Sequence, residues 1–240
     1  MTAVPARTRG SSDFTRQPVS LAGTEFLADA SGALWWPGER TLIVSDLHLE
    51  KGSAHAMRGL MLPPYDTRET LARLATIIER YAPRTVIALG DSFHDMAAEQ
   101  RLQTGSRSTI ADLQRGREWI WIAGNHDPAI PASLGGTAAS TVVRGRMTFC
   151  HEPGPHADSS EIVGHFHPVA RAELRAGSLR RRCFATDSRR LVLPAFGAFT
   201  GGLNVLDAAF ETVLAAERLR VLLLGDDGVY PVATSCLRPD

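Results

Sequence analysis

The amino-acid sequence predicts an α/β fold with a partly parallel sheet. Short apolar runs at 41–44, 85–89 and 119–123 are separated by segments with helical spacing, which is the order of βαβ units. Polar residues of the kinds that bind metals follow directly after these runs. Because ligands gather at the carboxyl ends of strands in α/β sheets, we expect the functional site at that edge.

The N-terminal region combines a polar tail with a predicted hairpin. Residues 1–18 are rich in Arg, Ser, Thr, Pro and Gly and are predicted to be a disordered tail before a single domain at 19–240. Glycine and proline interrupt the apolar pieces at 21–36, which predicts a hairpin with one strand at 33–36. Residues 50–64 contain Gly, His and Pro and are predicted to form a loop.

Two helices are expected between the central strands. Asp66 is a good capping candidate for a helix in which Leu71, Leu74, Ile77 and Ile78 follow helical spacing, and this helix should end before Pro83. A second helical stretch is predicted at 109–117.

Beyond Pro128 the pattern changes to short strands and tight turns. We predict strands at 139–143 and 146–150 around an Arg-Gly turn, an arginine-rich hairpin at 171–190 and a glycine-rich loop at 194–204. Residues 208–218 are interpreted as a helix and 219–224 as a strand. No internal repeat or shift in composition marks a second domain.

Composition limits the classes of partner and the compartment. The formal net charge is zero and the pI is about 7.1, so nucleic-acid binding would need a local basic patch. Three widely spaced cysteines give no disulfide framework and suit a reducing compartment. The N-terminus lacks the apolar core of a signal peptide, and no apolar run approaches the roughly 20 residues of a membrane helix. We therefore expect a soluble cytoplasmic protein.

Five apolar runs each end in metal-type side chains. Two divalent ions that share a carboxylate need a mixed set of oxygen and imidazole ligands, and the strand ends supply such a set. Five strand ends of this kind are very unlikely to arise by chance. The candidate ligands are Asp46, His48, Asp91, Asn125, His151, His165 and His167.

The order D-x-H, G-D, G-N-H-D, a lone histidine and G-H-x-H resembles the calcineurin-like metallophosphoesterase superfamily over residues 41–168. That resemblance implies a two-sheet β sandwich flanked by helices in α/β/β/α layers. The flanking segments DLHLEKG, LPPYDTRETL, LGDSFHD, GNHDP, HEP, GHxHP and PAFGAFTGGLN are similar, over about 20–235, to the ligase-associated DNA damage response endonuclease group (PdeM). Members of this group are bacterial proteins encoded beside a DNA ligase, a helicase and an exonuclease.

The resemblance also implies roles for the site residues. The first metal would be held by Asp46, His48 and His167, the second by Asn125, His151 and His165, and Asp91 would bridge them. The ligand set suits two divalent transition-metal ions, Mn²⁺ first, with Fe or Zn²⁺ as alternatives. A water between the metals, made acidic by them, would be the nucleophile.

Further residues near these motifs are candidates for catalysis or substrate binding. By resemblance, His126 protonates the leaving oxygen or stabilises transition-state charge, and Asp127 orients its ring. The alternative for Asp127 is a turn residue before Pro128. His94 replaces an acid that is usual in the superfamily. It is a candidate substrate contact or donor to a ligand, although a lone histidine beside a loop is more often neither. Lys51, the one lysine, is another candidate contact.

The leading function is hydrolysis of phosphodiester bonds in DNA by a repair-associated endonuclease or phosphodiesterase, with the DNA ligase and helicase of the gene cluster as possible partners. Arginines at 171–190, with Arg180, Arg181 and Arg182 at the centre, could hold DNA, and the alternative is a solvated hairpin face. No long insert separates the motifs, so an open cleft is expected. Alternatives are a small-molecule phosphatase, a cyclic-nucleotide phosphodiesterase, or a non-catalytic repair scaffold.

Overall fold

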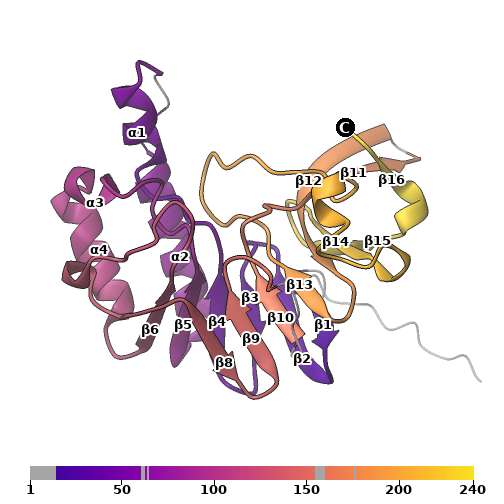
Figure 1. The fold of residues 1–240 in the computed structure, drawn as a ribbon, viewed down its shortest axis with the longest axis horizontal. Helices are drawn as coiled ribbons and strands as arrows, with labels where there is room; N and C mark the ends of the chain where they lie inside the picture. The colour runs from indigo at the N-terminus through magenta and orange to yellow at the C-terminus, as the bar shows by residue number, and fades with distance from the viewer. Residues whose placement is uncertain (1–14, 61–62, 64, 155–159, 176) are drawn as a thin grey trace, which may run out of the picture.

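The computed structural model describes residues 15–60, 63, 65–154, 160–175 and 177–240. Across these residues the strands form two mixed sheets that pack face to face, and the α-helices cover the outer face of the first sheet (Figure 1). This arrangement confirms the predicted α/β sandwich. No helix in the described part of the chain is long and apolar enough to cross a bilayer.

The first sheet has its strands in chain order, β1 to β7, across the described residues. Neighbouring strands are antiparallel from β1 to β4 and parallel from β4 to β7. Thr41 pairs with Thr85, and Thr85 pairs with Glu118, so the residues that follow β4, β5 and β6 leave the sheet at one edge. The strands are β1 (Arg16–Leu21), β2 (Thr24–Asp29), β3 (Leu34–Trp36), β4 (Thr41–Val44), β5 (Thr85–Leu89), β6 (Glu118–Ile122) and β7 (Thr137–Ala139).

The N-terminal boundary differs from the prediction. β1 begins at Arg16 and pairs with β2, so residues 16–18 belong to the sheet and not to a tail. Residues 1–14 lie outside the described residues. The predicted tail at these positions and the predicted single domain after it therefore remain predictions.

The described helices are α1 (Lys51–Met57), α2 (Asp66–Tyr81), α3 (Ala98–Arg101) and α4 (Thr104–Gln114). The bounds predicted for α2 are confirmed: its apolar stripe is buried, and Ala82 closes it in a left-handed conformation before Pro83. The predicted loop at 50–64 is wrong at α1. The Gly52 amide donates to Asp66 and the Glu50 amide donates to Thr67. Because these bonds join the first turn of α1 to the start of α2, no pattern within residues 50–64 indicates them.

The second sheet follows the order β15-β14-β12-β13-β10-β9-β8 in the described residues, and β11 and β16 extend it beside β12. Its strands are β8 (Thr141–Arg144), β9 (Met147–Cys150), β10 (Ser160–Val163), β11 (Val169–Leu174), β12 (Gly177–Thr186), β13 (Arg190–Val192), β14 (Arg220–Leu224), β15 (Val229–Val232) and β16 (Leu237–Arg238). The predicted strand at 139–143 spans two strands, because β7 and β8 belong to different sheets. The turn predicted at 144–145 lies one residue later, at Gly145 and Arg146, because Arg144 is the last residue of β8 and pairs with Met147.

Side chains alternate between the two faces of each strand, and the apolar ones form three layers. Leu42 and Val44 face the helices, whereas Ile43 faces the second sheet. Phe210, Val213 and Leu214 cover the outer face of the second sheet. The helix predicted at 208–218 is wrong, because this segment forms separate 3-10 turns whose buried residues imitate helical spacing. The 3-10 turns are η1 (Ala132–Leu134), η2 (Ala208–Phe210), η3 (Ala216–Arg218) and η4 (Thr234–Cys236).

Candidate metal centre

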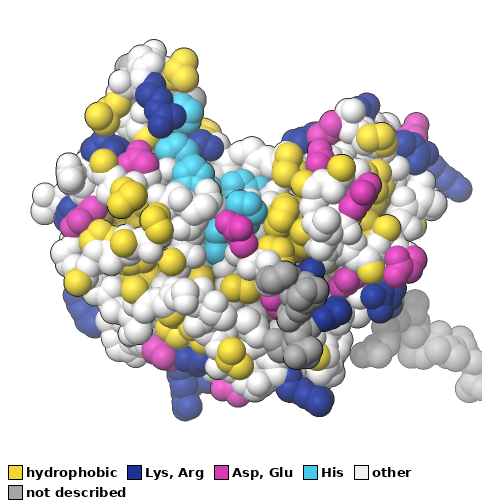
Figure 2. Space-filling model, viewed as in Figure 1, with side chains coloured by type: hydrophobic (Ala, Val, Ile, Leu, Met, Phe, Trp, Pro, Cys, Tyr) yellow, Lys and Arg dark blue, Asp and Glu magenta, His cyan; other side chains and the backbone are white. Residues whose placement is uncertain are grey.

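The candidate ligands follow β4, β5, β6, β9 and β10 and converge in a hollow. Figure 2 shows this hollow between two raised lobes, with histidine side chains on its floor and up the side of the lobe that carries α1. Hydrophobic side chains border the histidines on the opposite wall. The strand register described above places these residues together, as the sequence predicted.

The first predicted ligand set forms a tight group. The Nε2 atom of His167 lies 3.2 Å from Oδ1 of Asp46 and 3.2 Å from Nε2 of His48. Asp46 and His48 are buried, and the amide of His165 and the hydroxyl of Ser45 both donate to the Asp46 carboxylate. A carboxylate and two imidazoles at this spacing suit a divalent transition-metal ion.

The second predicted set has the same character. Oδ1 of Asn125 lies 2.9 Å from Nε2 of His151 and 2.9 Å from Nδ1 of His165, and these two ring nitrogens are 3.2 Å apart. Nδ1 of His151 donates to the carbonyl oxygen of Leu89, so Nε2 is the ring nitrogen that faces Asn125 Oδ1 and His165 Nδ1. Two imidazole nitrogens and an amide oxygen that converge in this way fit a shared cation.

Asp91 lies between the two sets. Its Oδ2 atom is 3.8 Å from Nε2 of His48 and 3.5 Å from Nε2 of His151, and its Oδ1 atom accepts the amide of His126. One carboxylate oxygen therefore faces both groups of ligands. This position fits the bridging role that the sequence predicted for Asp91.

The backbone at the centre is strained. Five of the seven predicted ligands have φ between 43° and 68°, a region that side-chain-bearing residues seldom adopt: Asp46, His48, Asp91, His165 and His167. Glycines make the close packing possible. Gly90 has φ of 75°, and a Cβ there would lie 2.5 Å from Nδ1 of His151. A Cβ on Gly164 would clash with the Ser45 hydroxyl. Strain of this kind is concentrated at functional sites.

The electrostatics of the centre favour ionised carboxylates. Burial alone would raise the pKa of Asp46, but the hydrogen bond and charge of His167, with the other histidines, hold it below its usual value. Burial also opposes ionisation of Asp91, yet His151 and its neighbours lower the pKa of Asp91 to about 2. Burial lowers the pKa of His48 to about 3. Burial would lower the pKa of His151 as well, but Asp91 and Asp46 raise it to about 9.

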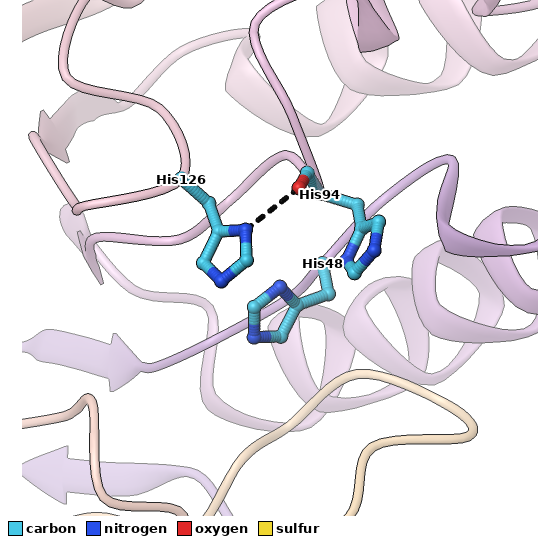
Figure 3. A group of neighbouring side chains, drawn as sticks. All are labelled: His48, His94 and His126. Atoms are coloured by element: carbon cyan, nitrogen blue, oxygen red, sulfur yellow. Dashed lines mark hydrogen bonds between the residues drawn. The ribbon is translucent and has the colours of Figure 1, made fainter. Parts of the chain in front are cut away.

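His126 follows the ligand Asn125 predicted for the second set, and its side chain is partly exposed. Its Nδ1 atom donates to the main-chain carbonyl of His94 (Figure 3), and its Nε2 atom lies 3.9 Å from Oδ2 of Asp91. The ring is thus oriented by a backbone carbonyl. In this geometry the exposed Nε2 atom can carry a proton to a substrate bound in the hollow.

The prediction that Asp127 orients His126 is wrong. The buried Asp127 carboxylate accepts the amide of Gly124 at Oδ1 and the amide of Phe93 at Oδ2, both at 3.0 Å. Burial raises the pKa of Asp127 to about 7. The side chain turns back into the strand ends, so Asp127 joins the loops after β5 and β6, which is closer to the alternative of a turn residue.

A family model described as calcineurin-like phosphoesterase matches residues 39–177, more than half of the chain. The chain belongs to the calcineurin-like phosphoesterase family. The crystal structure of Pseudomonas putida nuclease MPE is similar, with a TM-score of 0.70 and 32% sequence identity over 90% of this chain and 100% of that chain. No curated protein is significantly similar to the chain. The resemblance stated from the motifs is therefore confirmed.

The phosphoesterase has a second row of histidines beside the ligands. The His94 ring stacks on His126 at 5.3 Å between centroids and on His55 of α1 at 5.5 Å. Nδ1 of His94 and Nδ1 of His48 are buried without a hydrogen-bond partner among the described residues. Burial, followed by the charge of His126, lowers the pKa of His94 to about 4. His94 thus contacts the catalytic region through its ring and its carbonyl.

One wall of the hollow carries α1. Lys51 is its first residue, and burial lowers the pKa of the Lys51 ammonium although Asp66 opposes the shift. A cavity of about 640 Å³ adjoins Asn125 and His126 and is also lined by Met57, Arg58 and Met96. This cavity gives the phosphoesterase open space directly beside the candidate proton donor.

The predicted arginines lie apart from the ligands and mostly have partners. Arg180 donates to the carboxylate of Asp240 and to the carbonyl of Gly202, and the guanidinium of Arg181 is 3.9 Å from Asp226. Arg182 donates to the carbonyl of Ala195. Burial, with the like charge of Arg73, lowers the pKa of Arg182 to about 10. The three arginines line a cavity of about 410 Å³ with Thr200 and Gly201.

Several contributors to the site were not predicted. Ser45 supports Asp46, His55 stacks on His94, and the carbonyls of Leu89 and His94 orient His151 and His126. The position of Ser45 directly before Asp46, in an otherwise apolar run, was a usable signal. A main-chain carbonyl has no side-chain identity, so no sequence pattern could have indicated the other two contacts.

Proposed function

We propose that this protein is a dimetal phosphodiesterase that cleaves nucleic acid, with DNA as the leading substrate. The observation that carries the proposal is the convergence of seven ligands into two sets of facing acceptors around Asp91. The structural similarity to a protein named as a nuclease supports the choice of nucleic acid among phosphoesters.

The donor groups fit two divalent transition-metal ions. Asp46, His48 and His167 would hold one, Asn125, His151 and His165 would hold the other, and Asp91 would contact both. Mixed imidazole, carboxylate and amide ligands favour Mn²⁺, with Fe or Zn²⁺ as alternatives. When bound, such ions supply Lewis acidity that activates water and stabilises charge on the phosphoryl group.

The chain itself supplies proton transfer through His126. With Nδ1 held by the His94 carbonyl, Nε2 is the ring nitrogen that faces the candidate ligands, 3.9 Å from Asp91, and it would carry the second proton of a cationic ring. The Nε2 proton then moves to the leaving oxygen as the phosphorus–oxygen bond breaks. Because the His126 side chain is 41% exposed, a polymer lying across the hollow can reach it.

The shape of the site supports a polymeric substrate. The hollow is open between two lobes (Figure 2), and the cavity beside His126 is bounded by Met57 and Met96, whose side chains are exposed. By resemblance we also propose a role in DNA repair with a DNA ligase and a helicase as partners. A small-molecule phosphatase, a cyclic-nucleotide phosphodiesterase and a non-catalytic scaffold are the outcomes against which the proposal is tested.

The decisive test is a Mn²⁺-supplemented activity panel with an EDTA-treated control. It compares bis-p-nitrophenyl phosphate, p-nitrophenyl phosphate, 2′,3′-cyclic nucleotides, and single- and double-stranded DNA. We expect hydrolysis of the diester and of DNA, weaker action on the monoester, and none with EDTA. Preference for the monoester or for cyclic nucleotides alone would contradict the nucleic-acid assignment. Inactivity on every substrate would favour the scaffold.

A further inference from the structure

Phe199 has an unusual conformation and exposure. It lies in the glycine-rich loop after β13 with φ of 57°, and 47% of its surface is exposed. A bulky side chain in the left-handed region is a genuine outlier, and glycine or asparagine is the usual occupant. Its neighbours Phe196 and Ala198 are buried, so packing alone does not explain an exposed aromatic at this position.

The loop is anchored to the metal centre on both sides of Phe199. Before it, the amides of Phe196 and Gly197 donate to the carbonyls of Ser45 and Asp46, at 2.8 and 3.1 Å. The Ala198 amide donates to Thr70 Oγ1 at 2.9 Å. These bonds fix the backbone on the Asp46 side, so the orientation of the Phe199 side chain is imposed by the loop.

After Phe199, the loop is held against the other side of the first ligand set. Gly202 packs so closely on His167 that a Cβ there would overlap the His167 carbonyl oxygen. The Gly202 carbonyl accepts Arg180. Consecutive Cα atoms are about 3.8 Å apart, so the Cα of Phe199 lies within about 8 Å of that of Gly197. Phe199 therefore lies in the loop segment between the backbone contacts to Asp46 and to His167, two of the residues predicted to hold the first metal.

The next residues of the loop line a cavity that contains arginines. Thr200 and Gly201 line the cavity of about 410 Å³ with Arg180, Arg181, Arg182 and Asp226. Because Arg180 and Arg181 are paired with Asp240 and Asp226, the exposed aromatic side chain of Phe199 is the feature of this loop that suits a nucleotide, whose bases stack on aromatic rings. Hydrophobic side chains on this wall of the hollow are visible beside the histidines (Figure 2).

We propose that Phe199 stacks on the base of a nucleotide that flanks the scissile phosphate. This inference rests on the proposed nuclease function and adds to it a residue that selects nucleic acid over simple phosphodiesters. Stacking tolerates every base, because each has a π face, so Phe199 confers preference for polynucleotides without reading sequence. The strained loop has the role of holding the ring ready before the substrate arrives.

The test uses Phe199→Asn, since asparagine tolerates the left-handed backbone and the variant should fold at least as stably as the wild type. Affinity for a fluorescent single-stranded oligonucleotide, measured by anisotropy in EDTA, should fall by roughly 5- to 150-fold. The Mn²⁺ content of the variant, measured by metal analysis, should be unchanged because Phe199 supplies no ligand atom. Phe199→Trp should keep the affinity. Leu206→Ala, which removes an apolar side chain of 43% exposure farther along the chain, is the matched control and should have no effect.

An oligonucleotide series with one abasic residue on either side of the cleavage position identifies the stacking partner. At one position the abasic residue should weaken wild-type binding by the same factor as Phe199→Asn and add nothing in that variant. Wild-type affinity in Phe199→Asn, or an equal abasic effect in both proteins, would overturn the role of Phe199 and leave the nuclease function intact. Failure of the wild type to cleave any oligonucleotide would instead overturn the nuclease function, and the role of Phe199 with it.

Discussion

The metal centre and the arginine hairpin of β11 and β12 both concentrate polar side chains, but the partners of these side chains differ between the two regions. In the centre, ring nitrogens and oxygens of His151, His165 and Asn125 face one another at 2.9–3.2 Å. In the hairpin, Arg180 and Arg181 have carboxylates from Asp240 and Asp226. The arginines of the hairpin thus find partners within the chain, whereas the side chains of the centre converge on one another in a way that suits a bound cation.

This difference indicates that converging polar side chains on a strained backbone mark a binding site better than a high density of charged side chains does. Charge density in the hairpin is largely balanced by the chain, and exposed ion pairs of this kind contribute little. Facing acceptors and a strained backbone carry a free-energy cost that a ligand must offset. Substitutions in the two regions should therefore have very different consequences.

The largest effect is expected at Asp91. Asp91→Ala removes the carboxylate oxygen that faces both ligand sets, so the protein should lose at least one metal and nearly all turnover. Metal analysis of the purified variant by mass spectrometry, beside the wild type, is the measurement. Two retained equivalents would show that Asp91 does not join the two sets.

His126 should affect turnover without affecting metal content. His126→Ala is expected to keep two metals and to lower kcat by roughly 10²–10⁴, the usual contribution of a general acid. The loss should be smaller for diesters of p-nitrophenol, because that leaving group needs little protonation. Steady-state rates across leaving groups of different pKa give the answer, and an equal loss on all of them would instead indicate charge stabilisation.

Asp127 tests whether a buried carboxylate with full partners is structural. Asp127→Ala leaves the amides of Phe93 and Gly124 without their acceptor, so the free energy of unfolding should fall by about 2–4 kcal/mol. Urea denaturation of the metal-free protein measures this change, with Asp226→Ala, at a carboxylate whose side chain is 95% exposed, as the comparison. Unchanged stability together with a His126-like loss of kcat would restore Asp127 as the residue that orients the ring.

The smallest effect is expected in the hairpin. Replacing Arg180, Arg181 and Arg182 with Gln should flatten the slope of log K against log salt for duplex DNA by no more than about 0.9, the value for one phosphate contact. Two of the three arginines are already ion-paired with carboxylates. This pairing limits the number of phosphate contacts they can make and therefore the number of counterions that DNA binding releases. Hydrolysis of bis-p-nitrophenyl phosphate should not change. A slope change corresponding to three contacts would make the hairpin a principal DNA-binding surface.

The convergence of the candidate ligands could be predicted because their signal is local. Each follows an apolar strand, and parallel register places the strand ends together, so residues distant in sequence share one edge. Helix α1 could not be predicted from its own segment, because the amides of Gly52 and Glu50 donate to Asp66 and Thr67 of another helix. Asp127 was misassigned for a related reason: its direction depends on the backbone of the loop after β5, which the sequence does not specify.

We propose that two cations bind in the centre, one on either side of Asp91. Anomalous scattering from a crystal soaked in Mn²⁺ would locate them. Two peaks are expected, one among Asp46, His48 and His167 and one among Asn125, His151 and His165, with Asp91 in contact with both. A single peak, or peaks that Asp91 does not touch, would contradict the dimetal centre.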